Sequence, residues 1–189
     1  MNGETFEGYN QRRWGSSGWT RHLKQEGRKD QMGADFRNWK WWPNTFKAHQ
    51  LVHYFTDKQV EGRTNIDTNT CNTILFKAIY EEGLNISNVD TLVNIGMEQM
   101  HTLENSSLED DKRELESFLR NNDGGQYVQS EIEKGRMTYD ISGVPYFIVE
   151  SVDGEETNSG VSRRRKPYAL SGAQPSSVFL EVFQRICDE

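Results

Sequence analysis

The sequence predicts an α+β fold that is mostly helical. Through most of the 189-residue chain, apolar residues recur at the three- and four-residue spacing of helices that bury one face. At residues 146–151 the pattern changes to that of a strand, and a second strand-like stretch follows a polar loop. We therefore expect a helical subdomain over residues 15–138, and a smaller part over 139–189 that holds a β-hairpin and a C-terminal helix.

The N-terminal part is polar and has little periodicity. We expect a short helix or a loose arm over residues 1–16, a charged helix-capable stretch over 17–36, and no strand before residue 140. A tryptophan cluster follows, and we interpret it as a seal on the helical bundle, with a ligand or base-stacking platform as the alternative. Its members are Trp39, Trp41 and Trp42.

About five helices are predicted between residues 43 and 138, each from one apolar stripe. In chain order, the stripes are Ala48, Leu51, Val52 and Phe55; Cys71, Ile74, Leu75, Ala78 and Ile79; Val89, Leu92, Val93, Met97 and Met100; Leu108, Leu115, Phe118 and Leu119; and Tyr127, Val128 and Ile132.

Residues at the ends of these stripes predict where the helices begin. Pro43 suits the first turn of a helix, and Ser87 with Asp90 has the spacing of a capping box. Ser107 is expected to start the helix that carries the fourth stripe. Gly96 lies on the apolar face of its helix, so we expect a neighbouring helix to approach closely there.

The C-terminal part predicts two short strands and a last helix. The strands are expected at residues 146–151 and 167–172, joined by the polar loop 152–166. Pro175 suits the first turn of the helix and Gln174 is placed to cap it. A two-stranded hairpin is marginal by itself in water, so we expect it to need further strands. The apolar face of the last helix comprises Phe179, Val182, Phe183 and Ile186.

Charge and composition exclude several classes of protein. The chain has 22 basic and 29 acidic residues and a net charge of −7, which argues against a nucleic-acid partner. The basic run at 163–166 is interpreted as a solvated loop tip, with a localisation signal or an anion site as alternatives. Because we find neither a signal-peptide pattern nor a membrane-spanning apolar run, we predict a reducing, cytoplasmic location and no membrane partner.

Neither cysteine is predicted to be catalytic. Cys71 lies on an apolar helical stripe and is expected to be buried, whereas Cys187 is near the C-terminus and open to modification or cross-linking. His49 and His53 stand one helical turn apart, a spacing at which two histidines can ligate one metal. No third ligand lies near them in sequence, so we predict packing or surface roles and no metal site.

Four stretches of the chain carry a resemblance to a known family. Through these stretches the chain resembles the DsbA-like thioredoxin-fold proteins, and most closely the FrnE-type thiol-disulfide oxidoreductases of polyketide synthesis. The resemblance covers residues 15–189. The matching stretches are PNTFKAHQL (43–51), LFKAIYEEGLNISNVDTLV (75–93), ISGVPYFIV (141–149) and YALSGAQPSSVFLEVF (168–183).

This resemblance implies a fold, a site and a class of substrate. The chain (1–189) would be a single, partial DsbA-like domain with a large helical insert. The Val144–Pro145 bond would be cis, and the Val144 backbone would be free to pair with an extended substrate. Val144 and Pro145 are therefore the candidate substrate-binding residues. The implied partners are protein thiols and disulfides or small thiols.

The resemblance also implies what this chain lacks. In the family, the catalytic C-x-x-C pair heads the first helix of an N-terminal β-α-β unit, and no residues of this chain match that unit. We therefore expect thiol-disulfide exchange to be an ancestral activity that this chain, as written, does not perform, and we expect the hairpin to miss the family's N-terminal strands.

Two alternative functions remain open. The first is glutathione binding, because kappa-class glutathione transferases and 2-hydroxychromene-2-carboxylate isomerases share the helical insert and the cis-proline loop; glutathione is the one candidate cofactor. The second is a non-enzymatic interaction protein, whose exposed sheet edge would recruit a partner or a second copy to form a homodimer.

Overall fold

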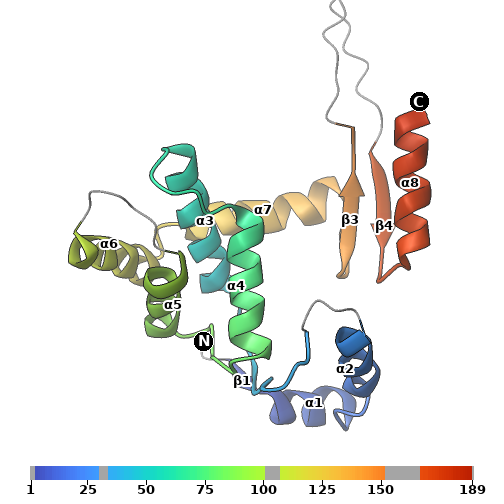
Figure 1. Ribbon diagram of the computed structural model, residues 1–189, viewed down its shortest axis with the longest axis horizontal. Coiled ribbons are helices and arrows are strands. Elements are labelled where there is room, and N and C mark those ends of the chain that lie inside the picture. Colours follow the sequence, from blue (N-terminus) through green and yellow to red (C-terminus); the bar gives the residue numbers. More distant parts are fainter. Residues whose placement is uncertain (1–2, 30–33, 101–106, 152–166, 189) are drawn as a thin grey trace, which may run out of the picture. The chain divides into compact units, whose positions relative to one another are not determined.

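The computed structural model describes residues 3–29, 34–100, 107–151 and 167–188. Within them the chain forms eight α-helices, one π-helical stretch and two separate two-stranded antiparallel sheets (Figure 1). The prediction of a mostly helical α+β fold is therefore confirmed. The chain divides into two compact units, Met1–Ser130 and Glu131–Glu189, and the boundary falls within a helix.

The first unit holds most of the helices, and α7 crosses the boundary into the second unit. In chain order the elements are β1 (Glu4–Thr5), α1 (Phe6–Trp14), α2 (Thr20–Lys29), β2 (Trp41–Trp42), α3 (Phe46–Val60), α4 (Thr68–Tyr80), α5 (Val89–Ile95), the π-helical stretch Gly96–Met100, α6 (Leu108–Asn121), α7 (Gly125–Thr138), β3 (Tyr146–Val149), β4 (Tyr168–Ser171) and α8 (Ser176–Asp188).

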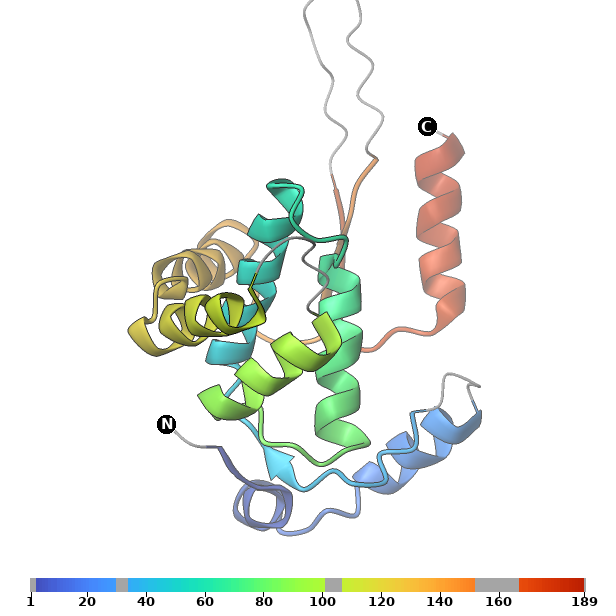
Figure 2. The ribbon, with the colours of Figure 1, turned by 60° about the vertical axis from the view of Figure 1, so that its left-hand side comes forward.

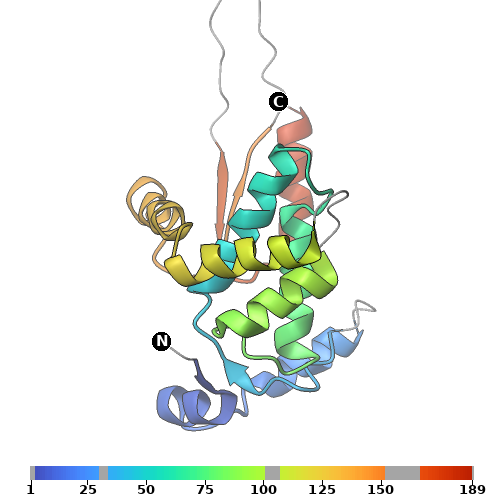
Figure 3. The same ribbon diagram turned by 90° about the vertical axis from the view of Figure 1, so that its left-hand side faces the viewer.

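The apolar core of the first unit lies between α3, α4, α5 and α6 (Figure 3). The predicted stripes on these helices supply it: Leu51, Cys71, Leu92 and Leu119 are each 0% exposed. Leu108 departs from its predicted stripe and is 58% exposed, because it is the first residue of α6 and lies outside the packed part of that helix. The predicted bundle is therefore built from the residues that the spacing identifies.

The prediction that no strand precedes residue 140 is wrong. Glu4 pairs with Trp42 and Thr5 with Trp41, so β1 and β2 form a short antiparallel sheet. This pairing keeps the chain extended through Trp42, and α3 therefore begins at Phe46 rather than in the turn of Pro43. The two-residue strands are too short to show the alternation that marks a strand in a sequence.

The start of α5 also differs from the predicted capping box. The Asn88 side chain caps the helix by accepting a hydrogen bond from the Asp90 N–H at 2.8 Å. The Ser87 hydroxyl instead accepts from the backbone N–H of Asn44 at 2.7 Å. Ser87 is therefore used to tie the start of α5 to the segment before α3, a contact between residues far apart in sequence.

The tryptophan cluster joins the N-terminal helix to α4. The Trp42 ring stacks on Tyr9 with ring centroids 3.8 Å apart, and Trp39 lies 4.5 Å from Phe6 and 5.0 Å from Tyr80. Trp39 also packs against the core of the first unit, which agrees with the predicted sealing role for that residue, whereas Trp42 stacks on the N-terminal helix. These contacts also explain how a polar N-terminal segment with weak periodicity is held in place.

The second unit contains the predicted hairpin and the predicted last helix. Strands β3 and β4 pair antiparallel, with Tyr146 opposite Ser171 and Val149 opposite Tyr168. Helix α8 runs alongside the two strands (Figure 2). The Gln174 side chain is used at the end of β4, where its amide nitrogen donates to the Ser171 carbonyl at 2.7 Å. The loop 152–166, with the basic run 163–166, lies outside the described residues.

Neither sheet extends the other. The β1–β2 pair and the β3–β4 hairpin are separate two-stranded sheets, and no strand of the described residues adds to the hairpin. Among the described residues of the second unit, only α8 and the end of α7 therefore lie beside the hairpin.

Gly96 has the role that its position predicts. A Cβ atom at this residue would lie 2.6 Å from Leu115 Cδ2 and 3.4 Å from Leu51 Cδ1. The Leu115 side chain of α6 therefore fills the space beside Gly96 and would have to move for any larger residue, which confirms the prediction of a close helix contact.

We expect Gly96→Ala to destabilise the first unit by about 1–3 kcal/mol, because the added methyl group must displace side chains in a packed core. Gly135→Ala is the matched control. Gly135 is also helical, but its Cβ would meet nothing closer than Ile141 Cδ1 at 3.6 Å. Alanine there should be neutral or stabilising by up to about 1 kcal/mol. Urea unfolding followed by circular dichroism measures both, and equal effects would contradict the close contact.

Candidate functional site

The loop before β3 holds the candidate substrate-binding residues Val144 and Pro145. Helix α7 ends at Thr138, and the Ile141 N–H donates to the Gly135 carbonyl at 3.1 Å, which turns the chain away from the helix axis. The Val144–Pro145 peptide bond is cis, as predicted. The Pro145 carbonyl accepts from the Gly172 N–H at 2.8 Å, so the loop is tied to the turn after β4.

Val144 is exposed to solvent. Its side chain is 90% exposed, and a Cβ atom at the preceding Gly143 would have no neighbour within 4 Å. Within the described residues, no hydrogen bond engages the Val144 backbone. Both the side chain and the peptide groups of this residue are therefore available to a ligand.

The hairpin register determines which backbone groups of β3 are free. The bond from the Gly172 N–H to the Pro145 carbonyl makes these two residues a hydrogen-bonded pair. In an antiparallel ladder such pairs alternate with pairs whose N–H and C=O groups point outward. The outward groups of β3 therefore belong to Tyr146 and Ile148, and those of β4 to Ala169 and Ser171.

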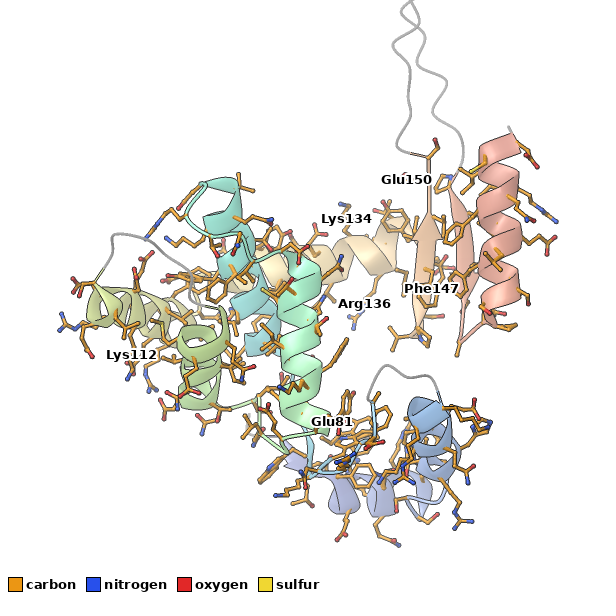
Figure 4. The ribbon with its side chains drawn as sticks, in the orientation of Figure 1. Glu81, Lys112, Lys134, Arg136, Phe147 and Glu150 are labelled. Carbon is orange, nitrogen blue, oxygen red and sulfur yellow. The ribbon has the colours of Figure 1, made fainter. Side chains whose placement is uncertain are left out.

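The two faces of the hairpin differ in what covers them. Phe147 packs edge-on against Phe179 of α8 with ring centroids 4.9 Å apart, so this face of β3 turns toward the helix (Figure 4). Tyr146 and Ile148 lie on the opposite face, because side chains alternate along a strand. Phe147 and Ile148 each remain 37% exposed, so neither face of β3 is closed.

The two cysteines have the environments that the sequence predicts. Cys71 is 0% exposed in the core of the first unit, and burial raises the pKa of its thiol to about 11, with a further contribution from the Asp67 carboxylate. Cys187 is exposed near the end of α8. A thiol in the position of Cys71 is protonated and shielded, so it is unsuited to disulfide exchange.

The two histidines of α3 have different environments: one is exposed and the other packs against an aromatic ring. His49 is exposed, whereas the His53 ring stacks on Tyr127 at 3.9 Å, with its Nδ1 3.4 Å from the Asp57 carboxylate. Among the residues that the structure describes, no group of three His, Cys, Asp or Glu side chains is arranged to hold a metal ion. The arrangement around His53 is that of packing on α7.

The sequence did not lead us to predict a buried lysine in α3. Lys58 is 8% exposed and forms an ion pair with Glu114 of α6, while its ammonium lies 5.2 Å from the Tyr54 ring centroid. Burial, and next the Glu114 charge, raises the pKa of the Tyr54 hydroxyl. The position of Lys58 one turn after Tyr54 on an apolar stripe is the only sequence signal. The cluster joins α3 to α6 and is structural.

A polar cleft also lies in the first unit, where the starts of α3 and α5 meet the end of α6. It has a volume of about 510 Å³ and contains Lys47, Asp90 and Arg120. Its charged groups are already satisfied: Arg120 pairs with Asp90 and Glu116, and the Lys47 ammonium donates to the Leu119 carbonyl. The cleft therefore offers no free charge that selects a ligand.

Comparison with known proteins leaves the family open. No family model matches the sequence, and no curated protein matches it. No helix within the described ranges has the length and apolar character needed to cross a bilayer. The DsbA-like assignment and the cytoplasmic location stay predictions.

The two thiols should differ sharply in reactivity. At mildly alkaline pH we expect iodoacetamide to modify the exposed Cys187 and to modify Cys71 at least about 100-fold more slowly, because the raised pKa of Cys71 leaves little thiolate and the core excludes the reagent. Mass spectrometry of the digested protein measures each site. In urea both thiols should react, and fast labelling of native Cys71 would contradict its burial.

Proposed function

We propose that this chain is a DsbA-like relative whose Val144–Pro145 loop is the binding wall for an extended, thiol-bearing or disulfide-bearing polypeptide. The thioredoxin-like origin of residues 139–189 is part of this proposal, and the GVP and SGAQP motifs support it. The single observation that carries it is that the exposed Val144 leads directly into a strand whose outer edge is unpaired within the described residues.

Strand addition is the chemistry that this geometry favours. An extended peptide that runs along the loop meets the free peptide groups of Val144 and then the outward groups of Tyr146. Each main-chain hydrogen bond contributes about 0.5–1.5 kcal/mol net. Recognition through the main chain accepts many sequences, which suits a protein that binds partly unfolded substrates.

The proposed role is binding rather than dithiol exchange by the chain's own cysteines. Exchange requires an accessible thiolate with a second thiol close by. Cys71 is enclosed in the core, and Cys187 has no cysteine near it in sequence. Val144 and Pro145 therefore have binding roles, and no catalytic residue is assigned.

Peptide binding provides the direct test. We expect a fluorescently labelled, uncharged peptide with one S-methylated cysteine to bind the full chain, and Val144→Lys to weaken that binding by about tenfold, because a charged side chain replaces the apolar contact beside the free peptide groups. Fluorescence anisotropy measures the affinity. Val60→Lys is the matched control, since Val60 is 84% exposed but lies in the other unit.

Two further outcomes separate the alternatives. The same peptide with N-methylated backbone amides should lose its affinity if main-chain pairing holds it. Displacement of the peptide by free glutathione would favour the glutathione-binding function instead. Equal affinities of the wild type, Val144→Lys and Val60→Lys would overturn the proposed site.

The chain should not speed the reduction of insulin by dithiothreitol, because its buried Cys71 cannot form the mixed disulfide that turnover needs. The turbidity of precipitating insulin chains measures the rate. Acceleration that survives Cys187→Ser would contradict the assignment of a binding role. Acceleration that this substitution removes would assign the activity to Cys187.

A further inference from the structure

We propose that two copies of this chain associate through the outer edges of β3, which joins their hairpins into one four-stranded antiparallel sheet. This association goes beyond the proposed binding role. It uses the outward groups of Tyr146 that the proposed peptide site also uses, so a second copy and a bound peptide exclude each other at this edge. Three features of the second unit lead to the proposed association: its thin core, the chemistry of the β3 edge, and the self-complementary order of residues along that edge.

The second unit has very little core of its own. Among its described residues only Val182 is buried, at 7% exposure. An isolated two-stranded hairpin is marginally stable in water, whereas three or more strands with an apolar face are stable. Further strands would therefore supply what the unit lacks. Large apolar side chains remain exposed around it, among them Met137, Val144, Leu180 and Phe183.

Along its four residues, the edge of β3 carries none of the charges or prolines that protect edge strands against pairing. Natural edge strands carry charges, prolines or bulges that keep other strands away. Between Pro145 and Glu150 the sequence is Tyr-Phe-Ile-Val, with no charge and no proline. The outward N–H and C=O groups of Tyr146 and Ile148 are unpaired within the described residues. This edge therefore presents a ready template for another strand.

Two β3 edges fit each other about a two-fold axis at Phe147. In that register Tyr146 of one copy faces Ile148 of the other, and both residues have outward backbone groups, so the two symmetric pairs exchange about four main-chain hydrogen bonds. The two Phe147 side chains then lie directly opposite each other on the α8 face. Aromatic pairs in this position stabilise a sheet.

Charge does not oppose this register. The nearest charged residue along β3 is Glu150, and the two-fold axis places it opposite Val144 of the other copy rather than opposite its own counterpart. The β4 edge is less suited to pairing, because its outward residues are Ala169 and Ser171 and the preceding Pro167 has no N–H to donate. The β3 edge is therefore the one that selects a second copy.

Sedimentation of the full chain over a range of concentrations tests the association. Because strand pairing buries less surface than a standard interface, we expect a dimer that dissociates in about the micromolar range. Ile148→Pro removes an outward N–H that the β3–β4 ladder does not use, so it should raise the dissociation constant at least about tenfold.

Ala169→Pro is the matched control. It places the same residue at the outward position on β4, directly across the hairpin from Ile148, and should leave the dimer intact. Circular dichroism checks that both variants keep their secondary structure. A wild-type chain that stays monomeric, or two proline variants that dimerise equally well or equally badly, would overturn the proposal.

A second measurement reports the register itself. With Cys187→Ser as background, Phe147→Cys should form a disulfide between copies on mild oxidation, because residues at the two-fold axis bring their Cβ atoms to about 4.5–5.5 Å. Leu180→Cys, at an exposed position of α8, should not. Cross-linking at Leu180 but not at Phe147 would place the interface on the helix and reject β3 pairing.

Discussion

The pairing of β3 with β4 determines what the second unit presents to a partner. One register, with Phe147 opposite Leu170, turns the Phe147 ring toward α8 and the peptide groups of Tyr146 and Ile148 toward the outer edge. A shift by one residue would reverse both assignments, because side chains and backbone groups alternate along a strand. The bond from the Gly172 N–H to the Pro145 carbonyl continues this register into the loop and leaves Val144 unpaired beside it.

The two units are stabilised in different ways. The first has a contiguous core between four helices, with a glycine that permits close approach and a buried Lys58–Glu114 pair that links α3 to α6. Among its described residues, the second has a hairpin, the end of α7, helix α8 and a single buried apolar side chain. A unit with so little internal burial has more to gain from association, since covering apolar surface is the main source of stabilisation in both folding and binding.

The positions of the thiols and of the open loop limit the chemistry available to the chain. Cys71 is a core side chain with a raised pKa, while the loop before β3 and the outer edge of that strand present apolar side chains and peptide groups that are unpaired within the described residues. Such a surface can hold another chain through its backbone but has no activated group beside it. Binding, either of a substrate polypeptide or of a second copy, is the function that both observations favour.

Periodicity in the sequence predicted the helices of the core, the hairpin and the last helix, because the spacing of apolar residues reflects which face is buried, and Gly96 marked the close contact for the same reason. The GVP stretch identified the exposed loop. The use of Ser87 to hold Asn44 and the pairing of β1 with β2 were decided only by the tertiary structure. So was the free edge of β3: it depends on which backbone groups β4 occupies, and contacts between residues distant in sequence have no local signal.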